Sequence, residues 1–174
     1  MADQAAPREG PRTIVVGLGN PVLGDDGVGW RVADEVECRL HAARDAGRRI
    51  PDVEIERLGV GGLRLMERLT GYEAAILVDA AEFPDRPAGE VRSCSFEALA
   101  DHAAGHLDST HDASLRTALA LGRRLGADLP ARIDTVTIQA HRTDEFSEEL
   151  SPEVLAAVPA AAAAVVELLG TEAR

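Results

Sequence analysis

The stretch Thr13–Gly29, TIVVGLGNPVLGDDGVG, decides the fold of this chain. It opens with the β-branched run Ile14-Val15-Val16, closed by glycine, and such a short apolar run predicts a buried β-strand. After a glycine-rich turn, apolar residues recur at helical spacing over residues 28–40, which predicts a helix. Asp25 and Asp26 therefore lie between a strand end and a helix start, where α/β proteins place their chemistry.

The two acids also have simpler interpretations. Aspartate is a good helix N-cap, so either residue could only stabilise the helix start, by about 0.3–1 kcal/mol. A dinucleotide-binding loop is disfavoured because Val22 stands where the G-x-G-x-x-G pattern needs its third glycine. Two carboxylates would also repel a pyrophosphate at the place meant to bind it.

Length and composition predict one soluble globular domain. The chain has 174 residues, of which 45% are hydrophobic and 28% are charged. We expect a flexible tail over residues 1–11 and a single α/β domain over residues 12–174. The net charge of −12 argues against a nucleic-acid partner, because phosphate binding needs lysine and arginine.

The sequence also bears on the compartment. Cys38 and Cys94 lie far apart without a C-x-x-C motif, so we expect two free thiols and a reducing cytoplasm. The N-terminal residues lack the apolar region of a signal peptide. No uninterrupted run of about 18 apolar residues is present, so no membrane span is expected.

Strand and helix patterns alternate along the chain. This alternation predicts a three-layer αβα sandwich with a mostly parallel, twisted sheet of about five strands. Pro159 is expected to kink or split the last helix. The expected strands lie near residues 12–18, 53–56, 74–78, 90–95 and 133–138, and the expected helices near residues 26–42, 63–69, 113–125 and 152–170.

A third acid follows the central strand. The apolar run 74–78 stops at Asp79, which could be a turn aspartate or a functional group. In a doubly wound sheet the carboxyl ends of adjacent parallel strands share one edge, roughly 5 Å apart. We therefore expect Asp26 and Asp79 to meet at that edge although they are distant in sequence.

Histidines supply the remaining candidate ligands. His41 lies at a helix end, where a cation is favoured for structural reasons. His102 and His106 form an i, i+4 pair that could bind metal if their segment were helical, and His111 precedes a predicted helix. From the residues alone, each is more often a surface or capping histidine than a ligand.

Three segments together resemble one protein family. GLGNPVLGDD at residues 17–26, ILVDA at residues 76–80 and STHDASL at residues 109–115 are similar, in order and spacing, to signatures of the nickel–iron hydrogenase maturation proteases, peptidase family M52. These endopeptidases remove the C-terminal extension of the hydrogenase large-subunit precursor after nickel insertion. The resemblance implies that function here, with the precursor as partner.

The resemblance also implies site residues. Asp26, Asp79 and His111 would be the metal-binding residues, and Asp26 and Asp79 would also be catalytic. Two carboxylates and an imidazole suit Ni²⁺ or Zn²⁺ and leave coordination positions open. The nickel would arrive with the precursor, and no organic cofactor is expected. Substrate-binding residues are predicted at Asn20, Gly59, Gly61 and Gly62, in a chain expected to be monomeric.

The chain departs from the family pattern in three places. Relatives often carry glutamate where Asp26 stands, so whether Asp25 or Asp26 is the ligand stays open. Arg57-Leu58 replaces an acidic turn, which leaves the hydrolytic base unidentified, and Gln139-Ala140 replaces an expected Glu-Pro.

Two other functions compete with the maturation endopeptidase. The missing acid keeps open a non-catalytic nickel-binding hydrogenase chaperone. The GLGNP motif also opens the peptidyl-tRNA hydrolases, but these carry a histidine soon after it, and none precedes His41 here. The charge of −12 further disfavours a tRNA ligand.

Overall fold

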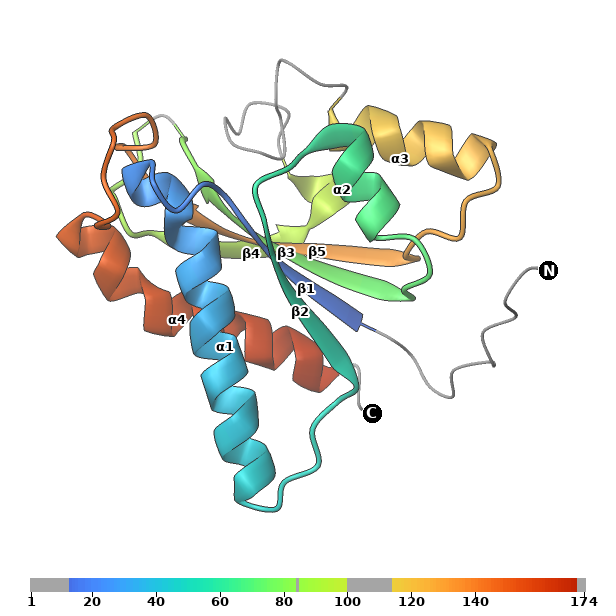
Figure 1. Ribbon diagram of the computed structural model, residues 1–174, viewed down its shortest axis with the longest axis horizontal. Helices are drawn as coiled ribbons and strands as arrows, with labels where there is room; N and C mark the ends of the chain where they lie inside the picture. The colour runs from blue at the N-terminus through green and yellow to red at the C-terminus, as the bar shows by residue number, and fades with distance from the viewer. Residues whose placement is uncertain (1–12, 84, 100–113, 172–174) are drawn as a thin grey trace.

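A computed structural model describes residues 13–83, 85–99 and 114–171 of the chain. Five strands form one sheet in the order β2-β1-β3-β5-β4, covered by helices on both faces (Figure 1). The strands are β1 (Thr13–Leu18), β2 (Val53–Leu58), β3 (Ala74–Ala81), β4 (Val91–Ser95) and β5 (Arg132–Gln139). The helices are α1 (Val28–Asp45), α2 (Gly62–Arg68), α3 (Leu115–Arg124) and α4 (Pro152–Thr171), with 3₁₀ turns η1 (Gly24–Gly27) and η2 (Phe96–Ala98). The expected tail, residues 1–11, lies outside the described residues.

Two hydrophobic cores make the three layers. Val15 of β1 and Ile76 of β3 pack toward α1 and α4 on one face of the sheet. Ile14 and Leu77, their neighbours in sequence, pack toward α2 and α3 on the other face. Because both faces are covered, the central strands consist of nearly continuous apolar residues rather than alternating apolar and polar ones. The predicted three-layer αβα sandwich is confirmed.

The strand directions bring the carboxyl ends of four strands to one edge of the sheet. β1 pairs in parallel with β2 and with β3, and β3 pairs in parallel with β5. Among the described strands only β4, at one edge of the sheet, is antiparallel to its neighbour. The carboxyl ends of β1, β2, β3 and β5 therefore share one edge, and the loops that leave it lead into α1, α2 and α4.

Asp79 lies inside β3, so the prediction that the strand stops there is wrong. β3 continues to Ala81 because β5 offers backbone partners over the whole length, pairing Asp79 with Thr137 and Ala81 with Gln139. The pairing of β3 with β1 ends at Val78, which pairs with Gly17 and directly precedes Asp79. Asp79 therefore begins the part of β3 that lies beyond its pairing with β1.

Pro159 does not split α4, which is one helix from Pro152 to Thr171. Proline removes the backbone hydrogen bond to the carbonyl four residues earlier, here that of Leu155. Both residues lie on the exposed side of α4, where water can hydrate that carbonyl. The expected start near residue 152 is confirmed, because α4 begins at Pro152, and proline is favoured at the first helical position.

The sequence predicts no membrane span, yet α4 has the length and composition of one over Pro152–Gly170, with a mean hydropathy of 1.8. Pro159 and Glu167 interrupt the apolar residues of α4, but its valines and leucines keep the average hydropathy high. Val154, Ala161 and Val165 are fully buried in the core shared with α1. These contacts make one side of α4 part of the hydrophobic core of the α/β domain.

Candidate active site

Glycines allow the loop after β1 to fold back on itself. Gly19 has a φ of 127°, a conformation that residues with a side chain rarely adopt. A methyl group on Gly29 would overlap the Leu18 carbonyl and lie 2.6 Å from the Val78 carbonyl oxygen. The start of α1 therefore packs directly on the backbones of β1 and β3, which brings η1 against β3 at the carboxyl edge.

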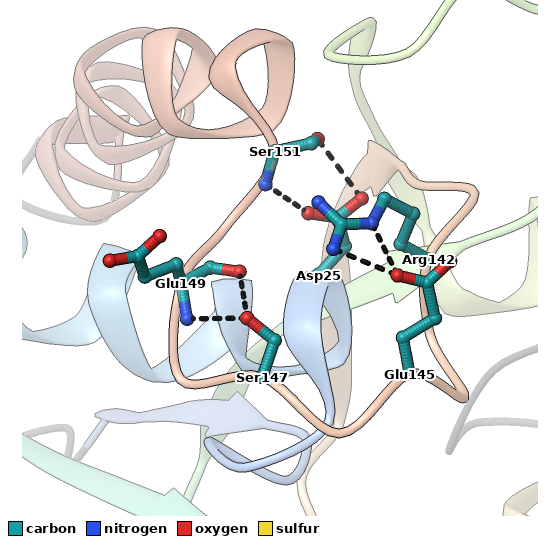
Figure 2. A network of polar contacts seen from close by, with 6 residues as sticks. All are labelled: Asp25, Arg142, Glu145, Ser147, Glu149 and Ser151. Carbon is teal, nitrogen blue, oxygen red and sulfur yellow. Dashed lines mark hydrogen bonds and ion pairs between the residues drawn. The ribbon is translucent and has the colours of Figure 1, made fainter.

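Asp25 faces the interior and holds two distant segments together. Its side chain is 1% exposed, and it accepts hydrogen bonds from the Ser151 amide at 2.6 Å and the Ser151 hydroxyl at 3.0 Å (Figure 2). The Asp25 amide itself donates to the Arg142 carbonyl at 2.9 Å. Both carboxylate oxygens thus serve the start of α4, which gives Asp25 a structural role.

The segment between β5 and α4 has its own polar network (Figure 2). Arg142 pairs with Glu145 at 2.8 Å, and the hydrogen bond and charge of that carboxylate raise the pKa of the guanidinium. The Ser147 hydroxyl accepts from the Glu149 amide at 3.0 Å. The Gly24 amide donates to the Ser147 carbonyl at 2.7 Å, so this segment is fixed both internally and against η1.

Asp26, unlike Asp25, lines an open pocket. Its Oδ2 accepts a hydrogen bond from the backbone amide of Asn20 at 2.6 Å, which fixes the orientation of the carboxylate. Only 6% of the residue is exposed. The pocket has a volume of about 620 Å³. Its lining comes from the β1–α1 loop, the first turn of α1, the residue after β2 and the β5–α4 segment: Gly19, Asn20, Pro21, Leu23, Asp26, Trp30, Gly59 and Thr143.

The predicted substrate-binding residues fall into two groups. Asn20 and Gly59 line this pocket together with Asp26. Gly61 and Gly62 do not belong to its lining, because they form the N-cap and first residue of α2.

Sequence reasoning missed two polar contributors to the pocket. The Thr143 hydroxyl donates to Glu82 Oε1 at 2.6 Å, linking the pocket wall to the end of β3. Trp30 donates its indole N–H to the Leu58 carbonyl at 3.4 Å and so connects α1 to β2. Thr143 lies in a polar stretch without a recognisable motif, and Trp30 shows in the sequence only as one more helix residue.

Asp79 is the second candidate catalytic acid. It is 1% exposed, and it follows Val78, on whose backbone the start of α1 packs. β3 contacts η1, so the elements that carry Asp79 and Asp26 lie against each other at this edge. His111 lies outside the described residues, as do His102 and His106. Ser114 caps α3, which places His111 three positions before that cap in the sequence.

No group of three or more His, Cys, Asp or Glu side chains gathers as a metal site within residues 13–83, 85–99 and 114–171. The metal site inferred from the resemblance therefore depends on His111 as its third ligand. The chemistry of two aspartates and one imidazole suits a borderline divalent cation.

The two other departures from the family pattern have structural roles here. Arg57 pairs with Asp34 at 2.6 Å and Glu37 at 2.5 Å, both on α1. Partial burial lowers the pKa of Arg57, but hydrogen bonds to these acids outweigh it, so the pKa is raised overall. Gln139 is 2% exposed and binds the Phe83 amide at 3.0 Å, which ties the end of β5 to the chain after β3.

Comparisons with known proteins agree with this architecture. A family model described as hydrogenase maturation protease matches residues 31–168. The hydrogenase expression/formation protein HupD of Thiocapsa roseopersicina is 23% identical over 147 residues, covering 84% of this chain and 62% of HupD. This alignment thus spans less than two thirds of that relative.

Solved structures share the fold. The hydrogenase maturating endopeptidase HybD from E. coli superposes with a TM-score of 0.69 at 23% identity, covering 92% of this chain and 93% of that one. The [NiFe] hydrogenase maturation protease HybD from Thermococcus kodakarensis gives a TM-score of 0.64 at 26% identity, covering 91% and 99%. With the family model matching most of its length, the chain belongs to the hydrogenase maturation protease family.

Proposed function

We propose that this protein is the endopeptidase that removes the C-terminal extension of a nickel–iron hydrogenase large-subunit precursor after nickel insertion. One observation carries the proposal. Asp26 is a nearly buried carboxylate that lines an open pocket at the carboxyl edge of the sheet, on an element that contacts the strand of Asp79. Such a pocket, with convergent polar groups, is where an α/β protein binds its substrate.

Three residues would divide the work of hydrolysis. The Asn20 amide holds the Asp26 carboxylate in one orientation, so Asp26 can bind the precursor's nickel or accept a proton from the attacking water. Asp79 supplies a second carboxylate, and His111 the imidazole. Nickel held between precursor and protease would position the scissile bond and polarise it. The pocket, with Asn20 and Gly59 in its wall, would receive the extended chain on one side of that bond.

The partner and the setting follow from the same proposal. The precursor would deliver the nickel, so the protease would need no resident metal. We also propose that it acts as a monomer and without an organic cofactor. We place the reaction in the cytoplasm, where Cys38 and Cys94 would remain free thiols as they are in this structure.

A direct test uses purified protein and nickel-loaded large-subunit precursor, with the reaction followed on a denaturing gel and by mass spectrometry. A downward shift by the mass of the C-terminal extension is expected with nickel and not with the nickel-free precursor. Asp26→Asn, Asp79→Asn and His111→Ala should each abolish the shift. Equal processing by His111→Ala would show that the ligand assignment is wrong.

A second candidate is a non-catalytic nickel-binding chaperone. It is favoured by Arg57, which occupies the place of the family's acidic turn and is paired with α1 rather than lining the pocket. Stable binding of the precursor without any downward shift would support the chaperone and contradict the endopeptidase. Peptidyl-tRNA hydrolysis is tested in parallel by release of the amino acid from peptidyl-tRNA.

A further inference from the structure

Two apolar side chains are exposed on the segments that border the pocket. Phe146 is 90% exposed, the most of any large hydrophobic residue among those described. Val22, on the loop after β1, is 36% exposed. An aromatic side chain this exposed loses contact with water only when another surface covers it, and aromatic residues are enriched at the energetic centres of protein interfaces.

The two residues lie beside each other. Leu23 and Ser147 form a parallel backbone bridge, so Val22 and Phe146, one position earlier on each segment, lie on neighbouring stretches of backbone. The Ser147 amide donates to the Val22 carbonyl at 3.1 Å. Residues far apart in the sequence thus contribute to one apolar spot, which we name the Phe146–Val22 spot.

The backbone under this spot is fixed. Phe146 lies between Glu145 and Ser147, whose side chains take part in the network of Figure 2. Asp25, beneath the loop, binds Ser151 at the far end of the same segment. A surface whose backbone is already ordered loses less conformational entropy on binding, which favours its use as a docking point.

The spot is continuous with the pocket wall. Val22 stands between Pro21 and Leu23, and both line the pocket that contains Asp26. Thr143, three residues before Phe146, lines the pocket from the other segment. A macromolecule that inserts an extended segment into the pocket would therefore cover the spot with the surface next to that segment.

Charge specifies the complementary surface. The segment that carries Phe146 is rich in acids, Asp144, Glu145, Glu148 and Glu149, and its arginine, Arg142, is paired with Glu145. An interface with an apolar centre and an acidic rim is complemented by an apolar depression with a basic rim.

We propose that the Phe146–Val22 spot docks the folded body of the large-subunit precursor beside its cleavable extension, through an apolar depression bordered by basic residues. This inference rests on the proposed function. The spot adds affinity for the whole precursor and takes no part in bond cleavage.

The test measures processing rates of nickel-loaded precursor over a range of precursor concentrations. Phe146→Ser is expected to raise KM at least about tenfold and to leave kcat within about twofold, because a docking residue acts on binding alone. Leu125→Ser is the matched control, because Leu125 is 77% exposed at the end of α3 and not in the pocket lining, and it should change neither constant.

Three outcomes would overturn the docking proposal. A KM of Phe146→Ser equal to that of the wild type would do so, as would an equal effect of Leu125→Ser. A wild-type dimer that Phe146→Ser converts to monomers in sedimentation would assign the spot to self-association instead. If the wild-type protein itself leaves the precursor uncut, the proposed function fails, and precursor binding by wild type and Phe146→Ser then tests the spot separately.

Discussion

Asp25 and Asp26 are chemically identical neighbours that the fold uses in opposite ways. Asp25 points inward, where both of its oxygens bind Ser151 at the start of α4. Asp26 lines the pocket, with one oxygen held by the Asn20 amide. Both are at most 6% exposed, so burial does not distinguish them. Their hydrogen-bond partners distinguish them. Both oxygens of Asp25 bind Ser151, so Asp25 stabilises the fold. Asp26 lines a pocket, where its carboxylate can take part in a reaction.

This contrast has a geometric origin. Within the single turn η1, successive residues point in different directions, so one acid reaches the α4 segment while the next reaches the pocket. A single peptide bond therefore joins the residue that holds the start of α4 to the residue that lines the pocket. Substitutions that separate stability from activity test the division directly.

The largest effect is expected for Gly29→Ala, which disturbs both acids at once. The added methyl group would meet backbone atoms of Leu18 and Val78, including the Leu18 nitrogen at 2.8 Å, and backbone cannot move aside as a flexible side chain does. We expect a loss of at least about 4 kcal/mol in the free energy of unfolding. Chemical denaturation followed by circular dichroism measures it.

Gly170→Ala is the matched control for that substitution. Gly170 lies near the end of α4 with no atom within 4 Å of an added methyl group. Alanine there should leave stability unchanged or raise it by up to about 1 kcal/mol. Equal stability of Gly29→Ala and Gly170→Ala would contradict the tight packing of α1 on the strand ends.

Asp26→Asn is expected to remove activity while sparing the fold. Asparagine keeps an oxygen that can accept the Asn20 amide hydrogen but loses the negative charge, so processing should fall by about 1,000-fold or more. The melting temperature should stay within a few degrees of wild type, as measured by differential scanning fluorimetry. Retained processing would remove Asp26 from the proposed chemistry.

Asp25→Ala should show the reverse. Loss of the carboxylate leaves the buried Ser151 amide and hydroxyl without their acceptor, which should lower the free energy of unfolding by about 3 kcal/mol. The processing rate per folded molecule should stay within about tenfold of wild type, since Asp25 does not line the pocket. A stable but inactive Asp25→Ala would reverse the assignment of the two acids.

The smallest effect is expected for Arg57→Gln. Arg57 pairs with Asp34 and Glu37, and these side chains are 26%, 54% and 43% exposed, so solvent screens both ion pairs. The free energy of unfolding should fall by less than about 1 kcal/mol, and the difference should shrink in high salt. Processing should be unchanged; a loss of activity would give Arg57 a part in the reaction after all.

Much of the fold was open to prediction because local patterns report burial and turns. Continuous apolar runs in β1 and β3 predicted a sheet covered on both faces, and the structure confirms it. The start of the last helix was predicted near residue 152, where α4 begins, since the preference of proline for the first turn of a helix is local. The end of β3 was missed because strand length depends on the partner strand, and β5 carries the pairing on to Ala81.

The site was predictable only in part. The motifs pointed to Asp26 and Asn20, and both line the pocket. They did not reveal Thr143 and Glu82, which are 61 positions apart and meet only in the folded chain. The positions of Gly61 and Gly62 at the start of α2 could not be predicted either, because a glycine-rich turn has the same sequence pattern whether it borders a pocket or begins a helix.

The sequence by itself determined the alternating elements, the sharp turn after β1 and the presence of two acids in it, since spacing, glycine content and residue type are local properties. Only the tertiary structure decided which acid belongs to the scaffold and which to the pocket. That choice rests on the contact between Asp25 and Ser151, 126 positions apart. Such a contact is set by how α4 packs on α1 and the sheet, which no local pattern encodes.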